Sequence, residues 1–357
     1  MNRIIRSTVL AALAIIVAVV PMSGCGTSED REEVQLHILL AGSMVIPFGE
    51  LEEAFEQIHP YIDVLNEGHG SIQVIRHITE IYDEADLAVV ADYSLLPMLM
   101  YPAQIPDGRG TYANWTISFA SNRLGIAYTP DSLYADEINS DNWYQILSRD
   151  DVFFGFSDPR FDACGYRTLM LIQLAEDYYS SQGLFHNLVT SNFQAKIRIS
   201  EADGVTTIKV PELFESTNKR IKLRGFSVQL LALLESHDID YAFQYESVAR
   251  QHGLEFLPLP GQIDLSSVDY ASEYSKVRVE LDYQRYASVN PEFQGQPIIY
   301  GITIPANAPH PEEAIEFIKF LLSSDGQQIL ADVSQPVMTP AVDEAANLPA
   351  ELSSIIG

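Results

Sequence analysis

The sequence predicts an α/β protein of two lobes. Short apolar runs alternate with amphipathic helical patterns, which is the rhythm of a parallel sheet covered by helices. Two long extended stretches, 114–130 and 298–309, are placed to cross from one lobe to the other and back. With 357 residues, 47% of them hydrophobic, the chain is long enough to form two medium cores. Such paired lobes often close around a small ligand.

The elements follow that rhythm along the chain. The first strand is expected at 35–40, and apolar residues then recur at helical spacing. Pro47 suits the first position of this helix and Pro60 suits its end. The later elements are expected as strands at 61–68, 85–92, 152–157 and 241–245, and as helices at 71–83, 141–148, 166–183, 227–240 and 310–330. Residues 183–222 are mixed and polar, and we expect an insertion there without assigning its structure.

The N-terminus predicts export. Arg3 and Arg6 form a basic start, and the apolar run 8–20 is too short to span a bilayer comfortably. The sequence "MSGC" then ends at Cys25, as in a lipobox. We therefore expect a signal peptide at 1–24 and a lipidated tether at 25–33, with lipid on Cys25. An uncleaved anchor and a plain export signal are the alternatives.

Charge and cysteine usage exclude several classes of partner. Lys and Arg number 21 against 49 Asp and Glu, a net charge of −28 that repels nucleic acid and anionic headgroups. We expect no nucleic-acid partner and membrane contact only through the lipid. Cys25 and Cys164 are the two cysteines, so a lipidated Cys25 leaves no disulfide and no cysteine-rich zinc site.

Four small polar turns stand directly before helices and are the candidate binding elements. A helix start exposes unpaired N–H groups and the positive end of the dipole, and a hydroxyl there can donate to an anion. Plain N-capping by Ser or Asp is the competing interpretation of any single turn. Because such turns gather at the carboxyl ends of parallel strands, four of them together favour an oxyanion pocket of neutral donors. The turns are 41–43, 70–71, 162–165 and 226–227.

Other candidates carry weaker signals. Tyr245 ends an apolar strand, where its phenol either reaches the cleft or packs in the core. Arg76 and Arg167 follow two of the turns and are expected on solvated or salt-bridged faces. His69 and His77 lie near Ser71 without the spacing of a metal-binding pair. No nucleophile elbow or P-loop occurs, so an exported hydrolase is only a remote alternative.

Six segments, in order, resemble the tungstate/molybdate-binding proteins of ABC importers, and most closely their archaeal-type tungstate-binding branch. The resemblance covers roughly residues 35–345. The segments are "AGSMVIPFGELEEAFEQIHP", "EGHGSIQVIRHITEI", "DEADLAVVADYSLLP", "DPRFDACGYR", "DYAFQYESVARQHGL" and "YGITIPANAPHPEEAIEFIKFLLS".

The resemblance implies a type II periplasmic-binding-protein fold with the oxyanion between the lobes. Lobe 1 is expected at 34–116 and 303–357, and lobe 2 at 117–302, with an insertion at about 171–222. The implied protein is an extracytoplasmic, lipid-anchored solute-binding protein that captures tungstate or molybdate for an ABC permease. It is expected to be a monomer without enzymatic activity, cofactor or bound metal cation. The same fold binding another small anion, such as sulfate or an organic acid, is the alternative.

Position by position, the resemblance also implies an oxyanion site. Ser43 and Ser71 match the serines that hold the oxyanion, and Tyr245 matches a tyrosine that donates to it. Asp162 matches an aspartate that approaches the metal centre and expands its coordination. The residues around Cys164 are expected to supply backbone N–H groups.

Two positions depart from the family pattern. By this alignment Ser227 stands where the family usually has a second carboxylate, a Glu, and Gln244 stands where Glu is common. One carboxylate plus an added hydroxyl would then hold a tetrahedral oxyanion, or the ligand preference would differ.

Overall fold

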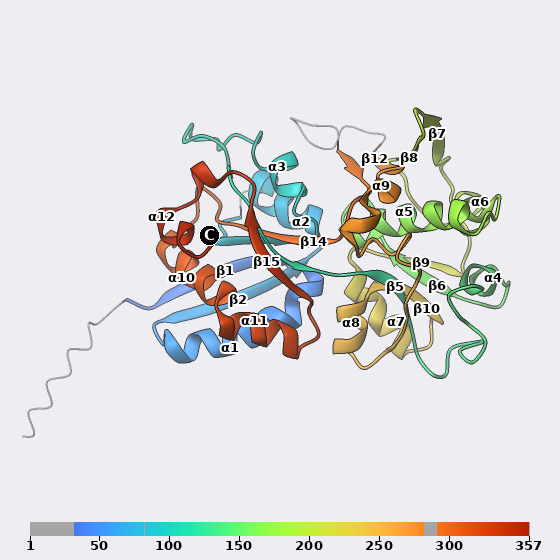
Figure 1. Ribbon diagram of the computed structural model, residues 1–357, viewed down its shortest axis with the longest axis horizontal. Helices are drawn as coiled ribbons and strands as arrows, with labels where there is room; N and C mark the ends of the chain where they lie inside the picture. The colour runs from blue at the N-terminus through green and yellow to red at the C-terminus, as the bar shows by residue number, and fades with distance from the viewer. Residues whose placement is uncertain (1–31, 82, 282–290, 357) are drawn as a thin grey trace, which may run out of the picture. The chain divides into compact units, whose positions relative to one another are not determined.

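Fifteen strands form three sheets in the computed structural model, which describes residues 32–81, 83–281 and 291–356 (Figure 1). The expected signal peptide, Cys25 and most of the expected tether lie outside the described residues. The mixed α/β class predicted from the sequence is confirmed.

The six-stranded sheet has the order β15-β4-β14-β3-β1-β2. Its N-terminal strands are parallel, since β1 pairs with both β2 and β3, whereas β14 runs antiparallel to β3 and β4. The strands are β1 (Val34–Ala41), β2 (Ile62–His69), β3 (Leu87–Val90), β4 (Ile117–Ser121), β14 (Ile299–Thr303) and β15 (Val337–Val342).

Helices pack against this sheet through buried apolar faces. Phe55 of α1 (Val45–Ile58) meets Phe317 of α10 (Pro311–Leu322), with ring centroids 5.1 Å apart. Figure 1 shows α1, α10 and α11 (Ser324–Asp332) together, and α2 (Ser71–Arg76) and α3 (Leu95–Leu99) as a second group. A π-helical turn, His77–Ile81, extends α2. The short helix α12 is Ala350–Ser353.

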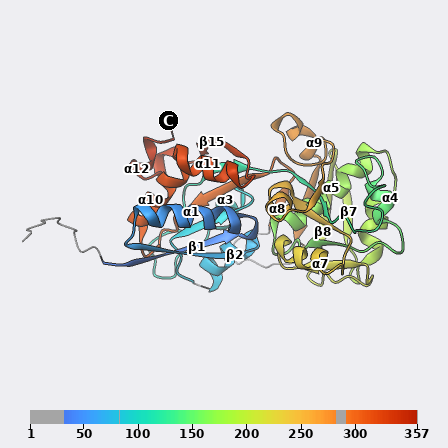
Figure 2. The same cartoon turned by 90° about the horizontal axis from the view of Figure 1, so that it is seen from below.

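The five-stranded sheet has the order β11-β5-β10-β6-β9. Helix α5 (Ala163–Tyr178) lies on one face, and α7 (Leu231–Glu235) and α8 (Glu246–Gln251) lie side by side on the other (Figures 1 and 2). Leu230, Leu234 and Ala249 pack on Ala242 of the sheet from that second side. The remaining elements are β5 (Leu124–Tyr128), β6 (Phe154–Ser157), β9 (Ile221–Arg224), β10 (Tyr241–Tyr245), β11 (Glu255–Leu257), α4 (Trp143–Leu147) and α6 (Leu184–Leu188).

A four-stranded sheet has the order β13-β12-β8-β7, and its strands β7 and β8 lie in the region 183–222 that the sequence left unassigned. It packs on α5, because the rings of Tyr166 and Phe293 stack with centroids 4.2 Å apart. Helix α5 itself runs to Tyr178, so the first part of the expected insertion is helical. The elements are β7 (Arg198–Ala202), β8 (Val205–Val210), β12 (Val277–Leu281), β13 (Glu292–Gln294) and α9 (Ala271–Tyr274).

Several local predictions differ from the structure, among them the helix expected at 310–330, which is broken at the extended residue Ser323 into α10 and α11. The extended stretch 114–130 is not continuous: it is broken at Asn122 and Arg123 into β4 and β5, which belong to different sheets. Helix α1 begins at Val45, so Pro47 is its third residue, which is tolerated because first-turn N–H groups need no partner. The helix expected at 227–240 is a 3-10 turn, η4 (Ser227–Leu230), followed by α7, which ends at Glu235. The predicted lobe boundaries themselves stay a prediction.

Candidate anion-binding site

Ser43 and Ser71 leave the same edge of the six-stranded sheet. Ser43 lies in the 3-10 turn η1 (Gly42–Met44) after β1, and Ser71 opens α2 after β2. Because β1 and β2 are parallel and pair as far as Ala41 opposite His69, both turns begin at the same level. Both serines are buried.

The hydroxyls of these serines bind groups from other elements and do not cap their own helices. Ser43 Oγ lies 3.0 Å from the Tyr300 hydroxyl, and Ser71 Oγ accepts from the Ala91 N–H at 2.9 Å. Neither serine makes a cap bond at the start of η1 or α2, and at α2 it is Gln73 Oε1 that accepts from the Gly70 N–H at 3.2 Å. N-capping therefore does not explain why serine stands in either turn.

Asp162 also turns away from the helix that it precedes. It occupies the position before α5 but makes no side-chain cap bond, and its Oδ2 accepts from the Ser227 N–H at 3.1 Å. Its exposed fraction is 4%. Burial raises the pKa of Asp162 to about 6, although the hydroxyl of Ser157, the N–H groups of Ser227 and Ser71 and the Arg167 charge favour the carboxylate. This carboxylate is therefore ionised at neutral pH and placed among donors.

Cys164 brings a buried neutral thiol to this neighbourhood, and Ser227 brings a backbone N–H. The Cys164 thiol lies 3.8 Å from the Phe243 carbonyl, and burial raises its pKa above the ordinary range, so it stays a neutral thiol. It is the second residue of α5, where N–H groups have no partner within the helix. Ser227, also buried, opens η4 and gives its N–H to Asp162.

Tyr245 lies at the carboxyl end of β10 in the five-stranded sheet, and its ring lies near Tyr300 of the six-stranded sheet. Its exposed fraction is 1%, and its ring centroid is 6.3 Å from that of Tyr300. Its oxygen accepts a hydrogen bond from Arg167 Nη1 at 2.9 Å. Burial raises the pKa of Tyr245 well above its ordinary value, so the phenol keeps its proton and can donate it.

Arg167 is the main residue of the site that the sequence did not assign. It is salt-bridged, as one of the two alternatives held, but it is 1% exposed rather than on a surface. Nη1 donates to the Ala91 carbonyl at 2.6 Å, and Nη2 lies 3.3 Å from Asp92 Oδ2. The sequence feature that could have indicated burial of Arg167 is the apolar character of its helix on all sides. In the structure residues 163–175 of α5 are all buried, and the arginine is buried with them. Arg76, in contrast, pairs with Glu80 near the surface.

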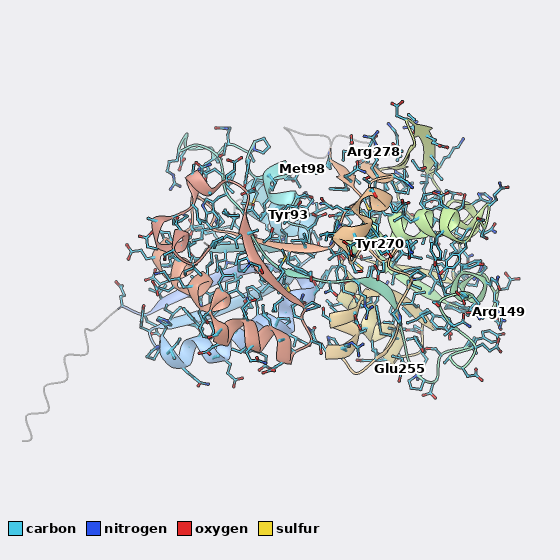
Figure 3. All side chains as sticks on the ribbon, in the orientation of Figure 1. Tyr93, Met98, Arg149, Glu255, Tyr270 and Arg278 are labelled. Carbon is cyan, nitrogen blue, oxygen red and sulfur yellow. The ribbon has the colours of Figure 1, made fainter. Side chains whose placement is uncertain are left out.

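Asp92 anchors the segment after β3 beside Arg167. The Tyr166 hydroxyl donates to its Oδ2 at 2.6 Å, and Ser94 and Gln296 donate to its Oδ1. The next residue, Tyr93, labelled in Figure 3 near α3, donates its N–H to the Ile299 carbonyl of β14 at 3.0 Å. The segment after β3 is therefore held by helix α5 on one side and by strand β14 on the other.

The structure brings all six predicted oxyanion residues into one connected neighbourhood. Hydroxyl and N–H donors surround one buried carboxylate, a set suited to an anion. In the part of the chain that the structure describes, no group of three or more His, Cys, Asp or Glu residues is placed to hold a metal ion. The connected residues are Ser43, Ser71, Ala91, Asp162, Cys164, Arg167, Ser227, Tyr245 and Tyr300.

Glycines next to the two serines let the opposite side approach closely. A Cβ at Gly70 would lie 2.4 Å from the Phe161 carbonyl oxygen, and one at Gly42 would lie 2.7 Å from the Phe226 ring. The Ile72 N–H donates to the same Phe161 oxygen at 3.1 Å. These glycines serve contact between the two sides of the site.

Gly70→Ala is expected to break the bond between the Ile72 N–H and the Phe161 carbonyl. The backbone at Gly70 (φ −68°, ψ 144°) suits alanine, so the effect comes from the contact alone. We expect hydrogen exchange at the Ile72 amide to accelerate by about five- to tenfold, the loss of one hydrogen bond. Gly49→Ala is the matched control, because a Cβ there meets nothing within 4 Å. Unchanged Ile72 exchange in Gly70→Ala would show that the contact does not constrain these turns.

The fold and the sequence together define the class of protein. The chain belongs to the family of bacterial extracellular solute-binding proteins, whose family model matches residues 36–332. Its fold is that of the type II periplasmic binding proteins. In the described residues, no helix is both long and apolar enough to cross a bilayer.

Particular relatives are similar along almost the whole chain. The molybdate/tungstate-binding protein WtpA of Pyrococcus abyssi is 37% identical over 357 residues, covering 97% of each chain. An uncharacterized solute-binding protein of Methanoculleus marisnigri is 40% identical, covering 93% of this chain and 94% of its own. Among solved structures, the periplasmic molybdate-binding protein of Azotobacter vinelandii superposes with a TM-score of 0.53 at 12% identity, covering 84% of this chain and 98% of its own. At that identity the structural likeness shows the fold alone.

Proposed function

We propose that this protein captures tungstate or molybdate and delivers it to an ABC permease. The observation that carries the proposal is the joint burial of three hydroxyls, from Ser43, Ser71 and Tyr245, with the carboxylate of Asp162. Hydroxyl donors suit the oxygens of a small dianion. The named relatives that bind molybdate and tungstate support the choice of ligand.

The role of Asp162 narrows the ligand to an oxyanion with a metal centre. Two unit charges of the same sign at about 4 Å repel by about 4 kcal/mol at an effective dielectric constant of 20. A site built only to donate to oxygens would avoid that cost. A carboxylate that bonds directly to tungsten or molybdenum compensates it, since these centres accept further oxygen ligands.

Sulfate is the second candidate, and Ser227 is the observation that favours it. Ser227 stands where the resemblance implies a second carboxylate, and it supplies an N–H to Asp162 instead. A site with one carboxylate can offer a metal centre only one additional oxygen-ligand side chain of this kind, so it is less specialised for a ligand whose centre takes more than four oxygens. An organic acid remains a further ligand class for the same screen.

The remaining features of the proposal concern location and partners. We propose export through a signal peptide at 1–24, lipid attachment at Cys25, and action as a monomer whose lobes, 34–116 with 303–357 and 117–302, close on the ligand. Closure would be the state that the permease recognises. The role is transport without catalysis, in keeping with a solute-binding family.

Titration calorimetry with tungstate, molybdate and sulfate tests the proposal, and Ser71→Ala locates the site. We expect Ser71→Ala to weaken binding of the preferred oxyanion by about 1–3 kcal/mol, because one oxygen of the ligand loses its donor. Ser148→Ala is the matched control, because this exposed hydroxyl donates to the Tyr144 carbonyl of its own helical turn. Absence of heat with both metal oxyanions would overturn the proposal, and a large preference for sulfate would replace it by the second candidate.

A further inference from the structure

Asn122 occupies the connection between the two main sheets and has a fixed amide orientation. It lies between β4 and β5 and is 3% exposed. Its Oδ1 faces two N–H groups, those of Arg123 at 3.0 Å and Ser247 at 3.4 Å. Since both neighbours are donors, the side-chain oxygen must face them and the NH₂ group must face the other way.

The NH₂ group of Asn122 points at two hydroxyls. It lies 2.8 Å from Ser247 Oγ and 3.0 Å from the Tyr300 hydroxyl. An amide NH₂ can only donate, so the Tyr300 oxygen accepts this bond. Tyr300 is fully buried, and burial raises its pKa to about 12, so it keeps a proton of its own.

The Tyr300 proton then has Ser43 as its partner. The two hydroxyl oxygens are 3.0 Å apart, and the geometry allows either one to donate. If Tyr300 donates, Ser43 Oγ accepts inside the protein and its own proton is free for a ligand. If Ser43 donates, it presents lone pairs to the ligand instead.

We propose that Asn122 and Tyr300 are positioning residues that orient the Ser43 hydroxyl as a donor toward the bound anion. The expected effect on anion affinity rests on the proposed function, whereas the hydrogen bonds among Asn122, Tyr300 and Ser43 do not depend on it. The other two hydroxyls of the site follow the same rule, because Ser71 Oγ accepts from the Ala91 N–H and the Tyr245 oxygen accepts from Arg167. Each hydroxyl oxygen is occupied by a protein donor, which leaves each proton for the ligand.

A double-mutant cycle on tungstate affinity tests the relay. Tyr300→Phe is expected to weaken tungstate binding roughly tenfold, because the Ser43 proton is no longer directed. In a Ser43→Ala background the same change is expected to cost less than about twofold, since the residue through which Tyr300 acts is gone. Tyr128→Phe, on β5, is the matched control and is expected to leave affinity unchanged. Equal losses in the two backgrounds would overturn the relay.

Neutron diffraction of the ligand-free, deuterium-exchanged protein separates failure of the relay from failure of the proposed function. A deuteron on Tyr300 directed at Ser43 Oγ supports the relay whatever the protein binds. A deuteron on Ser43 directed at Tyr300 overturns it even if tungstate binds tightly. If wild type gives no heat with any oxyanion, the proposed function fails and the deuteron position still decides the relay.

Discussion

Arg167→Met is expected to lower the free energy of unfolding by about 3 kcal/mol, measured by urea denaturation without ligand. The substitution keeps an apolar stem of similar length but removes every donor. The Ala91 carbonyl and the Tyr245 oxygen lose their partner, and the Asp92 carboxylate loses its counter-charge. Removing one member of a buried ion pair costs about 3–5 kcal/mol because the other charge stays buried.

The lower end of that range follows from the other donors around Asp92. Tyr166, Ser94 and Gln296 still hydrogen-bond its two oxygens in the variant, so the charge is not left bare. Adding Asp92→Asn to Arg167→Met removes the buried charge and is expected to recover part of the loss. A double variant less stable than the single one would show that the charge of Asp92 is not the source of the cost.

Arg76→Gln provides the control for Arg167→Met. Arg76 pairs with Glu80 one helical turn away, and both side chains are partly exposed. An ion pair of this kind contributes no more than about 0.5 kcal/mol to the free energy of unfolding, so Arg76→Gln is expected to change that free energy very little. If the two arginine variants were equally stable, Arg167 would be no more than a surface ion pair in energetic terms.

The sequence predicted the parts of this molecule that repeat a simple local rule. Alternating strand and helix patterns predicted the α/β class, which is confirmed, and turns such as 41–43 and 70–71 put Ser43 and Ser71 forward as candidate site residues. Such features can be predicted because a strand end or a helix start is determined by a few adjacent residues. The resemblance to known oxyanion-binding proteins gave Asp162 and Tyr245 specific roles, whereas the local pattern could not separate these candidates from a helix cap and a core tyrosine.

What sequence could not predict depends on contacts between distant segments. Tyr300 is 257 positions from Ser43, and Asn122 is 178 positions from Tyr300. Nothing near Asn122 distinguishes it from a turn residue, because its role comes from which elements meet there. The π-helical turn after α2 and the break at Asn122 were missed for the same reason: tertiary packing decides them.

Asp162→Asn is expected to weaken tungstate binding by about 100-fold, or about 2.7 kcal/mol, and to leave sulfate binding equal or tighter. The amide keeps the shape of the side chain and an oxygen for the Ser227 N–H, but it is a poor ligand for a metal centre. Sulfur in sulfate takes no further oxygen ligand, so for sulfate the carboxylate contributes only repulsion. The ratio of the two affinities therefore reports the metal–carboxylate bond itself.

The pH dependence of tungstate binding shows whether the ionised Asp162 carboxylate favours or opposes binding of the oxyanion. With the pKa of Asp162 raised to about 6 in the folded protein, the carboxyl is ionised at pH 7 and largely protonated at pH 5. If the carboxylate bonds the metal, tungstate affinity relative to the Asp162→Asn variant should fall as the pH decreases through 6. If it only repels the anion, the same ratio should rise.

Between pH 7 and pH 5 the free energy of unfolding of the ligand-free protein is expected to rise while tungstate affinity falls, as far as Asp162 is concerned. A carboxyl whose pKa is raised from 3.8 to about 6 on folding stabilises the folded state fully below pH 4 and loses that contribution as the pH rises through 6. In the ligand-free protein, ionised Asp162 is therefore a cost that Asp162→Asn removes. A variant that is more stable without ligand at pH 7 but binds tungstate more weakly would show that the buried carboxylate is retained for the ligand. A variant that binds tungstate as tightly as wild type would show that no metal–carboxylate bond forms and that the oxyanion is held by its oxygens alone.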